Sequence, residues 1–137
     1  MIGKNNPFNV RTNRHNKWQG QIGTKKGFAC FATPELGIRA AIIIVMLSYR
    51  NFGIFTIQDI VKRFAPPSEN NTEDYVIYIV RSTQIPPLKV LNSQDQYARV
   101  LHAMSRYEGN EVPYSKICEV MKLYNIQMSV NYEKENS

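Results

Sequence analysis

The strongest apolar pattern in the chain lies between Thr33 and Arg50, and it predicts a buried helix. Every residue from Ala40 to Leu47 is apolar, so no face of a helix there is left for water. A helix that is apolar on all sides is either a membrane span or the centre of a domain. Because the run is well short of the ~20 residues that cross a bilayer and is bounded by Arg39 and Arg50, we expect the centre of a domain.

The start of this helix carries residues that favour a helix N-terminus. Thr33 can accept hydrogen bonds from the free amides of the first turn, and Pro34 suits the first helical position. Glu35 would face the positive end of the helix dipole. We therefore expect a central helix over residues 33–50, with Gly53 adopting the left-handed conformation that often follows a helix end.

The rest of the chain predicts four further helices and one small hairpin. Apolar positions at helical spacing, capping residues and stops at Gly or Pro-Pro predict helices over residues 57–65, 72–82, 94–108 and 115–124. The hairpin is predicted from two short strands over residues 17–21 and 28–31, with its tip over residues 23–27. The expected fold class is therefore α+β and mostly helical, with about five helices in all, arranged around the buried central one over residues 33–50. Residues 1–128 are expected to form a single domain and residues 129–137 a flexible tail.

The charge of the chain favours anionic partners. Its 137 residues include 17 Lys and Arg against 11 Asp and Glu, which gives a net charge of +6. Nucleic acid, anionic lipid and cell-wall polymer all fit such a balance. The basic residues are scattered, with their densest cluster from Lys4 to Lys26, and no recognition-helix or base-stacking motif is found. We therefore expect no specific nucleic-acid partner.

Three further expectations follow from the composition. The first residues contain no apolar segment, so we expect no signal peptide, synthesis in the cytoplasm and delivery to the cell wall or a virion by other factors. Cys30 and Cys118 are expected to be small core residues rather than a disulfide. Neither His15 nor His102 lies near a cysteine in the sequence, so we expect no metal site and no cofactor.

Glu108 is the residue most informative about chemistry. In the helix predicted over residues 94–108, it continues the apolar stripe of Tyr97, Leu101 and Met104 into the last turn. Desolvation and the negative end of the helix dipole would both favour a protonated carboxyl there. A general acid that works near neutral pH needs such a group. The alternative is that the last turn frays and Glu108 extends into water.

The segment Ala103–Asn110 resembles the end of the catalytic helix in lysozyme-like lytic transglycosylases and glucosaminidases. In those families a run of the type Ala-x-x-x-x-Glu-Ser/Asn-Gly carries the catalytic acid. The match implies that Glu108 is the acid. The chain departs from the pattern in one place, because Gly109 follows the glutamate directly.

Three other segments share this resemblance. Residues 5–11 with Trp18-x-Gly20 are similar to the segment that follows the glutamate helix in those families, and residues 28–35 are similar to a glucosaminidase pattern. Residues 72–80 resemble the Thr-x-x-Tyr-Val-x-x-Val motif of transglycosylases, whose tyrosine lines the active-site cleft. Since the glutamate helix stands last instead of first, the chain resembles a circularly permuted lysozyme-like domain. The whole string is also similar to small phage and prophage proteins described as virion-associated.

The resemblance implies a peptidoglycan-cleaving glycosidase, either a lytic transglycosylase or a muramidase, that acts on the β-1,4 glycan strand. It implies catalysis by Glu108 and substrate contacts by Tyr75, Asn9 and Arg11, although a basic loop is often only solvated. Trp18 could stack on a sugar ring or pack within the hairpin.

A second carboxylate would assist hydrolysis. The candidates are Glu35, Glu69 and Asp74, each of which also has a simpler role as a helix N-terminal or loop charge.

A second hypothesis is that the protein is not a catalyst. The chain would then be a phage virion or assembly protein that keeps a lysozyme-like fold and binds glycan or other virion proteins. The two hypotheses share nearly all of their sequence features, and the surroundings of Glu108 separate them.

Overall fold

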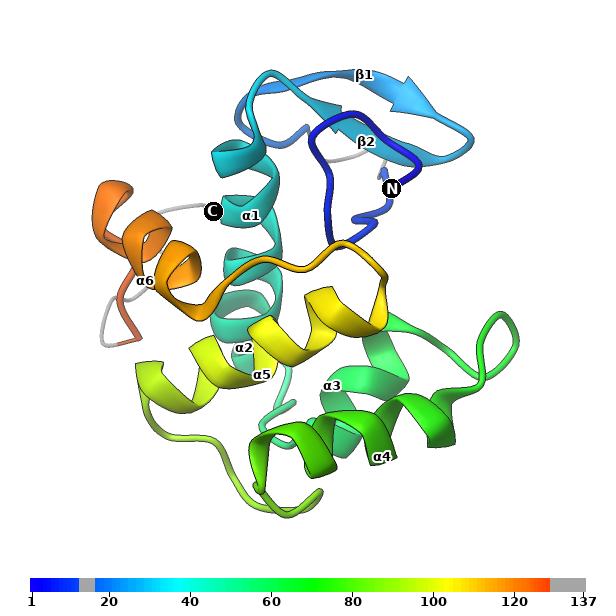
Figure 1. The fold of residues 1–137 in the computed structure, drawn as a ribbon, viewed down its shortest axis with the longest axis vertical. Coiled ribbons are helices and arrows are strands. Elements are labelled where there is room, and N and C mark those ends of the chain that lie inside the picture. The colour runs from blue at the N-terminus through cyan, green and yellow to red at the C-terminus, as the bar shows by residue number, and fades with distance from the viewer. Residues whose placement is uncertain (13–16, 129–137) are drawn as a thin grey trace.

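The structure, a computed structural model, describes residues 1–12 and 17–128 and consists of helices packed around one central helix, with a hairpin at one end (Figure 1). In chain order the elements are β1 (Gln21–Lys25), β2 (Phe28–Phe31), α1 (Pro34–Ile42), the π-helical segment η1 (Ile43–Ser48), α2 (Tyr49–Asn51), α3 (Ile57–Phe64), α4 (Thr72–Thr83), α5 (Gln94–Tyr107) and α6 (Tyr114–Leu123). The α+β class and the hairpin near the N-terminus are confirmed. The predicted tail over residues 129–137 lies outside the described residues.

The predicted central helix is confirmed, and α1, η1 and α2 follow one another without a break in helical geometry. The side chain of Thr33 accepts a hydrogen bond from the amide of Leu36 over 3.3 Å, as expected of an N-cap. At the other end Gly53 has a φ of +75° and donates its amide to Arg50. Among the described residues, no helix is long and apolar enough to cross a membrane.

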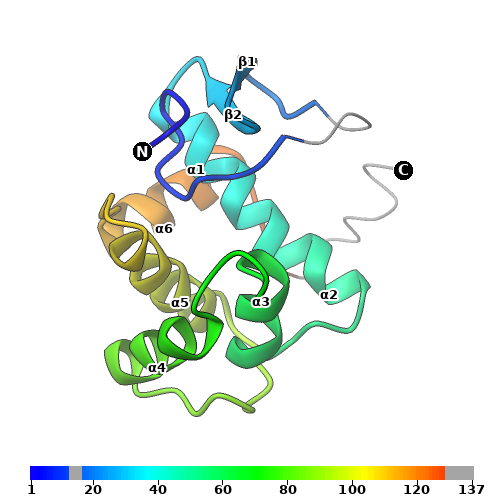
Figure 2. The same cartoon turned by 90° about the vertical axis from the view of Figure 1, so that its right-hand side faces the viewer.

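The other helices surround this central one. In Figure 1, α6 lies to one side of α1, and α5 crosses in front of the part of the central helix that follows α1. Figure 2 shows α4 and α3 at the end remote from the hairpin. The predicted starts of α3, α4 and α5 are confirmed, because the side chains of Thr56, Asn71 and Ser93 accept amide hydrogen bonds from the first turns. One continuous group of buried apolar side chains joins these helices to β2.

The middle of the central helix is wider than an α-helix. Over Ile43–Ser48 the hydrogen bonds span five residues, so that the amide of Tyr49 donates to the carbonyl of Ile44. The widened segment brings Ser48 and Tyr49 to the wall of a surface cavity described below. Periodicity alone predicted a regular helix here, and the π-helical geometry is a finding of the structure.

The first strand of the hairpin lies later in the chain than predicted, so the bounds 17–21 and the tip over 23–27 were wrong. Lys26 and Gly27 both have positive φ, +52° and +84°, which gives a two-residue turn that matches the twist of the strands. The pairing therefore continues up to Lys25 opposite Phe28. A separate turn at Gly20, with a φ of +77°, precedes the strand.

The N-terminal segment, residues 1–12, packs along β2. The fully buried side chain of Asn6 donates to the carbonyl oxygens of Val10 and Ala29, each over 2.9 Å, and accepts from the amide of Val10 over 2.8 Å. The amide of Ala29 donates in turn to Val10 over 3.0 Å. These bonds fix the backbone that carries Asn9 and Arg11.

Both cysteines differ from expectation in their burial. Cys30 and Cys118 are free thiols, as predicted, but each is only half-buried. Cys30 follows the fully buried Ala29 and precedes the fully buried Phe31 on β2, so strand alternation turns it toward the other face of the hairpin.

Gly37 provides a test of how the N-terminal segment meets the central helix. A Cβ added at Gly37 would stand 2.0 Å from the carbonyl oxygen of Asn5, which no side-chain movement can relieve. An open helix would gain about 1 kcal/mol from Gly→Ala, but overpacking of this kind costs about 1–3 kcal/mol. We expect Gly37→Ala to lower the free energy of unfolding by about 2 kcal/mol in urea denaturation.

The matched control is Gly23→Ala, because a Cβ at that position meets nothing within 4 Å. Its effect should stay within about 0.5 kcal/mol. If Gly37→Ala were as stable as the wild type, the N-terminal segment would not lie against this helix as described.

Candidate functional site

Glu108 stands at the end of α5, where the chain turns sharply. The amide of Asn110 donates to Ser105 and that of Gly109 to Arg106, each over 3.0 Å, and Gly109 has a φ of +84°. This pair of bonds is the Schellman motif, which closes a helix through a left-handed glycine. The last turn is therefore ordered rather than frayed, and Glu108 is half-buried.

Two side chains from distant parts of the sequence hold the carboxylate of Glu108. The hydroxyl of Tyr75 on α4 donates to Oε2 over 2.9 Å. The side-chain amide of Asn9 donates to Oε1, also over 2.9 Å. The oxygen of the Asn9 amide accepts from the backbone of Ile2 over 3.3 Å, which orients the amide with its nitrogen toward Glu108. The structure thus brings together three of the residues predicted to form the site.

Tyr75 is held rigidly for this contact. Its side chain is 1% exposed, and its ring stacks on that of Tyr107 with the centroids 4.0 Å apart. Burial raises the pKa of Tyr75 far above its usual range, and the negative charge of Glu108 and the hydrogen bond between them act in the same direction. The phenol is therefore a permanent donor at neutral pH.

The N-terminal segment meets the end of α5 at a second point as well. The side-chain amide of Asn110 donates to the carbonyl of Pro7 over 3.2 Å. Asn9 adopts a left-handed conformation with a φ of +54°, which asparagine tolerates better than most residues. This conformation belongs to the turn that presents Asn9 to Glu108.

A cavity of about 360 Å³ opens beside Asn9. It lies between the N-terminal segment, the end of the central helix and α3, and its lining consists of Asn9, Val10, Arg11, Thr12, Trp18, Ile44, Ser48, Tyr49, Phe52, Arg63 and Phe64. Three of the predicted substrate-binding residues, Asn9, Arg11 and Trp18, therefore share one cavity. We call this the Asn9 cavity.

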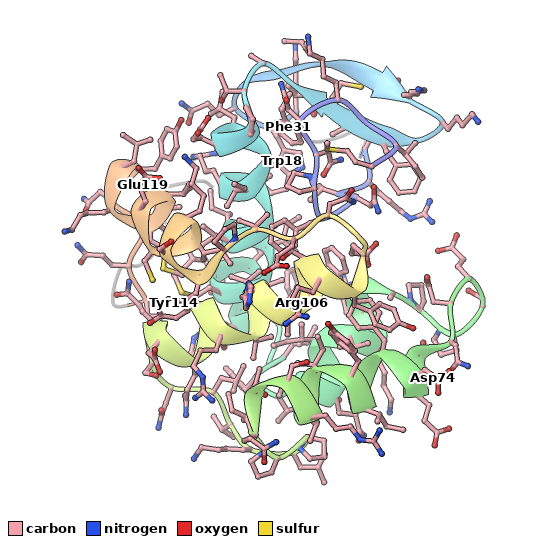
Figure 3. All side chains as sticks on the ribbon, viewed as in Figure 1. Trp18, Phe31, Asp74, Arg106, Tyr114 and Glu119 are labelled. Atoms are coloured by element: carbon pink, nitrogen blue, oxygen red, sulfur yellow. The ribbon has the colours of Figure 1, made fainter. Side chains whose placement is uncertain are left out.

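Arg11 and Trp18 have different surroundings within this cavity. The guanidinium of Arg11 lies 3.3 Å from the carboxylate of Glu69 and covers the ring of Phe28. Trp18 is half-buried and packs against the apolar core, so it both supports the fold and faces the cavity. Figure 3 shows Trp18 with Phe31 in the part of the molecule nearest the hairpin.

Glu35 does not join the group around Glu108. Its carboxylate lies 2.7 Å from the ammonium of Lys116 on α6, and the hydrogen bond from Lys116 holds the pKa of Glu35 below its usual value. Lys116 also lies 2.9 Å from Glu119. Glu35 thus forms an ion pair between α1 and α6 in the structure, and a role for it at the substrate stays a prediction.

The other candidates for a second carboxylate, Asp74 and Glu69, make different contacts in the structure. Asp74 lies at the N-terminal end of α4, at the outer edge of the molecule in Figure 3, where its amide donates to the capping side chain of Asn71. Glu69 is paired with Arg11, and of these two only Arg11 lines the Asn9 cavity. No group of three or more His, Cys, Asp or Glu among the described residues could hold a metal ion.

A larger hollow of about 810 Å³ lies between α3 and the start of α4. Its lining consists of Gln58, Lys62, Pro67, Asn70, Asn71, Thr72, Glu73, Val76 and Ile77. None of the predicted site residues lines it, so its size does not make it the stronger candidate.

Sequence reasoning missed several residues that shape the site. Tyr107, next to Glu108 in the chain, stacks on Tyr75, and Asn110 binds the N-terminal segment. Tyr49 and Arg63 complete the Asn9 cavity. A tyrosine directly before the motif glutamate was a visible signal, whereas Arg63 looks in the sequence like any basic residue in a last helical turn.

The buried tyrosines predict a loss of stability at high pH. Burial raises the pKa of Tyr49 to about 12, and that of Tyr75 still further. Above pH ~10 the unfolded chain loses these protons while the folded protein keeps them, so the free energy of unfolding must fall as the pH rises. The stability is fully present below that pH. Urea midpoints measured from pH 8 to 11 should show the decline, and Tyr75→Phe should make it shallower. Parallel declines for the two proteins would contradict the burial of this phenol.

The comparison with known proteins identifies one relative of this chain. No protein-family model matches the sequence. Protein P5 of Pseudoalteromonas phage PM2 is 33% identical over 118 residues, an alignment that covers 83% of this chain and 73% of that protein. Identity at this level over most of both sequences indicates common descent. The chain therefore belongs to the family of Protein P5 of Pseudoalteromonas phage PM2.

Proposed function

We propose that the protein is a peptidoglycan-cleaving glycosidase of a permuted lysozyme-like type, with Glu108 as its catalytic acid and base. The observation that supports this most is the convergence on one carboxylate. Tyr75 and Asn9 stand 33 and 99 positions away from Glu108 in the sequence, yet both donate hydrogen bonds to it. All three were singled out by the resemblance to lytic transglycosylases and glucosaminidases.

The chemistry requires one well-placed carboxyl group. Glu108, in its protonated form, would give its proton to the glycosidic oxygen as the bond from that oxygen to C1 breaks. The resulting carboxylate would then take the proton of the C6 hydroxyl of the same muramyl residue while that oxygen bonds to C1. The products are a shortened strand and a 1,6-anhydro end, and no water is consumed. Tyr75 and Asn9 would orient the carboxyl group of Glu108 in both steps.

Two ion pairs favour this route over hydrolysis. A hydrolase commonly places a second carboxylate about 5–9 Å from the first. Among the described contacts, the carboxylate of Glu35 pairs with Lys116 and that of Glu69 with Arg11, and neither of them contacts Glu108. An internal hydroxyl nucleophile removes the need for that partner.

The relationship to a phage protein fits an enzyme that opens a bacterial wall. It equally fits the second hypothesis, a virion or assembly protein without catalysis, which could use the same hydrogen bonds only to fix the end of α5. Activity on purified peptidoglycan separates the two hypotheses.

The decisive variant is Glu108→Gln, which keeps the size of the side chain and removes the acid. We expect it to lower the release of muropeptides from purified peptidoglycan by at least about 10²-fold, the lower range for loss of general acid–base catalysis. Mass spectrometry of the products should show 1,6-anhydro ends for the wild type. Reducing ends would instead indicate hydrolysis.

The control for Glu108→Gln is Glu111→Gln. Glu111 is an exposed carboxylate three residues further on, and among the described residues its ion pairs are with His102 and Arg106. This variant should digest peptidoglycan like the wild type. Release that survives in Glu108→Gln would remove this residue from the mechanism, and no release by the wild type would favour the non-catalytic hypothesis.

Asn9→Gly tests the second donor without straining the backbone. Asn9 has a positive φ that glycine adopts freely, so the substitution removes the amide and preserves the turn. We expect kcat on peptidoglycan to fall about tenfold, the equivalent of one lost hydrogen bond of about 1.4 kcal/mol. Asn5→Gly is the matched control, because Asn5 also has a positive φ but donates to Phe31 instead. Equal losses in both variants would mean that only the fold was affected.

A further inference from the structure

The Asn9 cavity differs from a neutral sugar-binding groove in its charge. Among the described residues, its lining holds two arginines, Arg11 and Arg63, and no carboxylate. Aromatic side chains, including Trp18 and Phe52, provide surfaces of the kind on which sugar rings pack. A cavity with this lining suits a sugar that carries a negative charge.

Arg63 is placed in the last turn of α3, where its exposed guanidinium can reach a ligand. The guanidinium lies 5.8 Å from the centroid of the Phe52 ring. It also acts electrostatically on the buried phenol of Tyr49, where its positive charge opposes the increase in pKa caused by burial. Arg63 and Tyr49 both line the cavity.

Arg11 is occupied by an internal carboxylate. Glu69, on the loop between α3 and α4, lies 3.3 Å from the guanidinium, and both side chains are about half exposed. An ion pair this exposed contributes little to stability. A carboxylate on a ligand could therefore replace Glu69 at small cost and form the bidentate contact that a guanidinium favours.

We propose that the Asn9 cavity is an anion-recognising subsite, in which Arg63 and Arg11 bind a carboxylate of the glycan and select peptidoglycan over neutral polymers of N-acetylglucosamine. The inference rests on the proposed function, because Asn9, which donates to Glu108, also lines this cavity, although Glu108 and Tyr75 do not. The carboxylate has two sources in peptidoglycan. In strands without peptides it is the lactyl group of each muramyl residue, and in strands with peptides it lies on the stem.

The test measures binding in the Glu108→Gln background, so that the glycan is not consumed. The probes are peptide-free glycan strands, strands that keep their stem peptides, and a chitin oligosaccharide of the same length. We expect one or both anionic strands to bind about tenfold more tightly than chitin, as charge-assisted hydrogen bonds allow, and the difference to shrink at high salt. Tighter binding of the peptide-free strand identifies the lactyl group, and tighter binding of the other identifies the stem.

Three variants, again with Glu108→Gln, assign the effect to residues. Arg63→Gln should reduce the affinity for the anionic strand to the affinity for chitin. The affinity for chitin itself should not change. Lys62→Gln is the matched control, since Lys62 loses the same charge one position away but lines the other hollow. Glu69→Gln should tighten the binding of the anionic strand, because it removes the carboxylate that pairs with Arg11.

Two results would overturn the subsite. One is equal binding of chitin and both anionic strands, and the other is an equal loss for Arg63→Gln and Lys62→Gln. The proposed function fails separately. If the wild-type protein cleaves peptidoglycan and chitin oligosaccharides equally well, the proposed glycosidase activity is supported and the proposed subsite is contradicted. If the anionic strand is bound selectively but the wild type does not cleave it, the proposed subsite is supported and the proposed glycosidase activity is contradicted.

Discussion

The close approach of the N-terminal segment to the central helix is the constraint on which the candidate site depends. Gly37 permits it, since a side chain there would meet the carbonyl of Asn5 at 2.0 Å. From that crossing the segment continues along β2, held by the buried amide of Asn6, until Asn9 reaches Glu108. Gly37, which has no side chain, and Asn6, whose side-chain polar atoms are all hydrogen-bonded, thus position Asn9 as one donor of the site.

Local signals predicted the helices well, because they act within a few residues. Eight consecutive apolar residues and a Thr-Pro-Glu start were enough to predict the central helix. The hairpin was misplaced because its turn uses Lys26 in a left-handed conformation, for which lysine carries no sequence signal. The π-helical segment shares its apolar residues with a regular helix, so no pattern distinguishes the two.

Contacts between distant residues were predictable only where a motif marked them. The resemblance pointed to Glu108, Tyr75 and Asn9, and these three are in contact. It could not show that Glu35 is paired with Lys116, because that ion pair depends on how α6 packs against α1. Arg63 was missed for the same reason, since its place in the cavity follows from the packing of α3 and not from its neighbours in the chain.

The order of the N-terminal segment and α5 along the chain matters less for the candidate site than the contacts between them in space. In the families that the chain resembles, the Asn-Asn-Pro segment follows the glutamate helix along the sequence. Here that segment precedes Glu108 by about a hundred residues, yet Asn9 and Pro7 bind Glu108 and Asn110 directly. A permutation changes which ends are joined and leaves the packing surfaces intact. Since a carboxylate responds to its neighbours in space, the same environment can arise from either order, and the chemistry proposed for Glu108 requires nothing more of the chain.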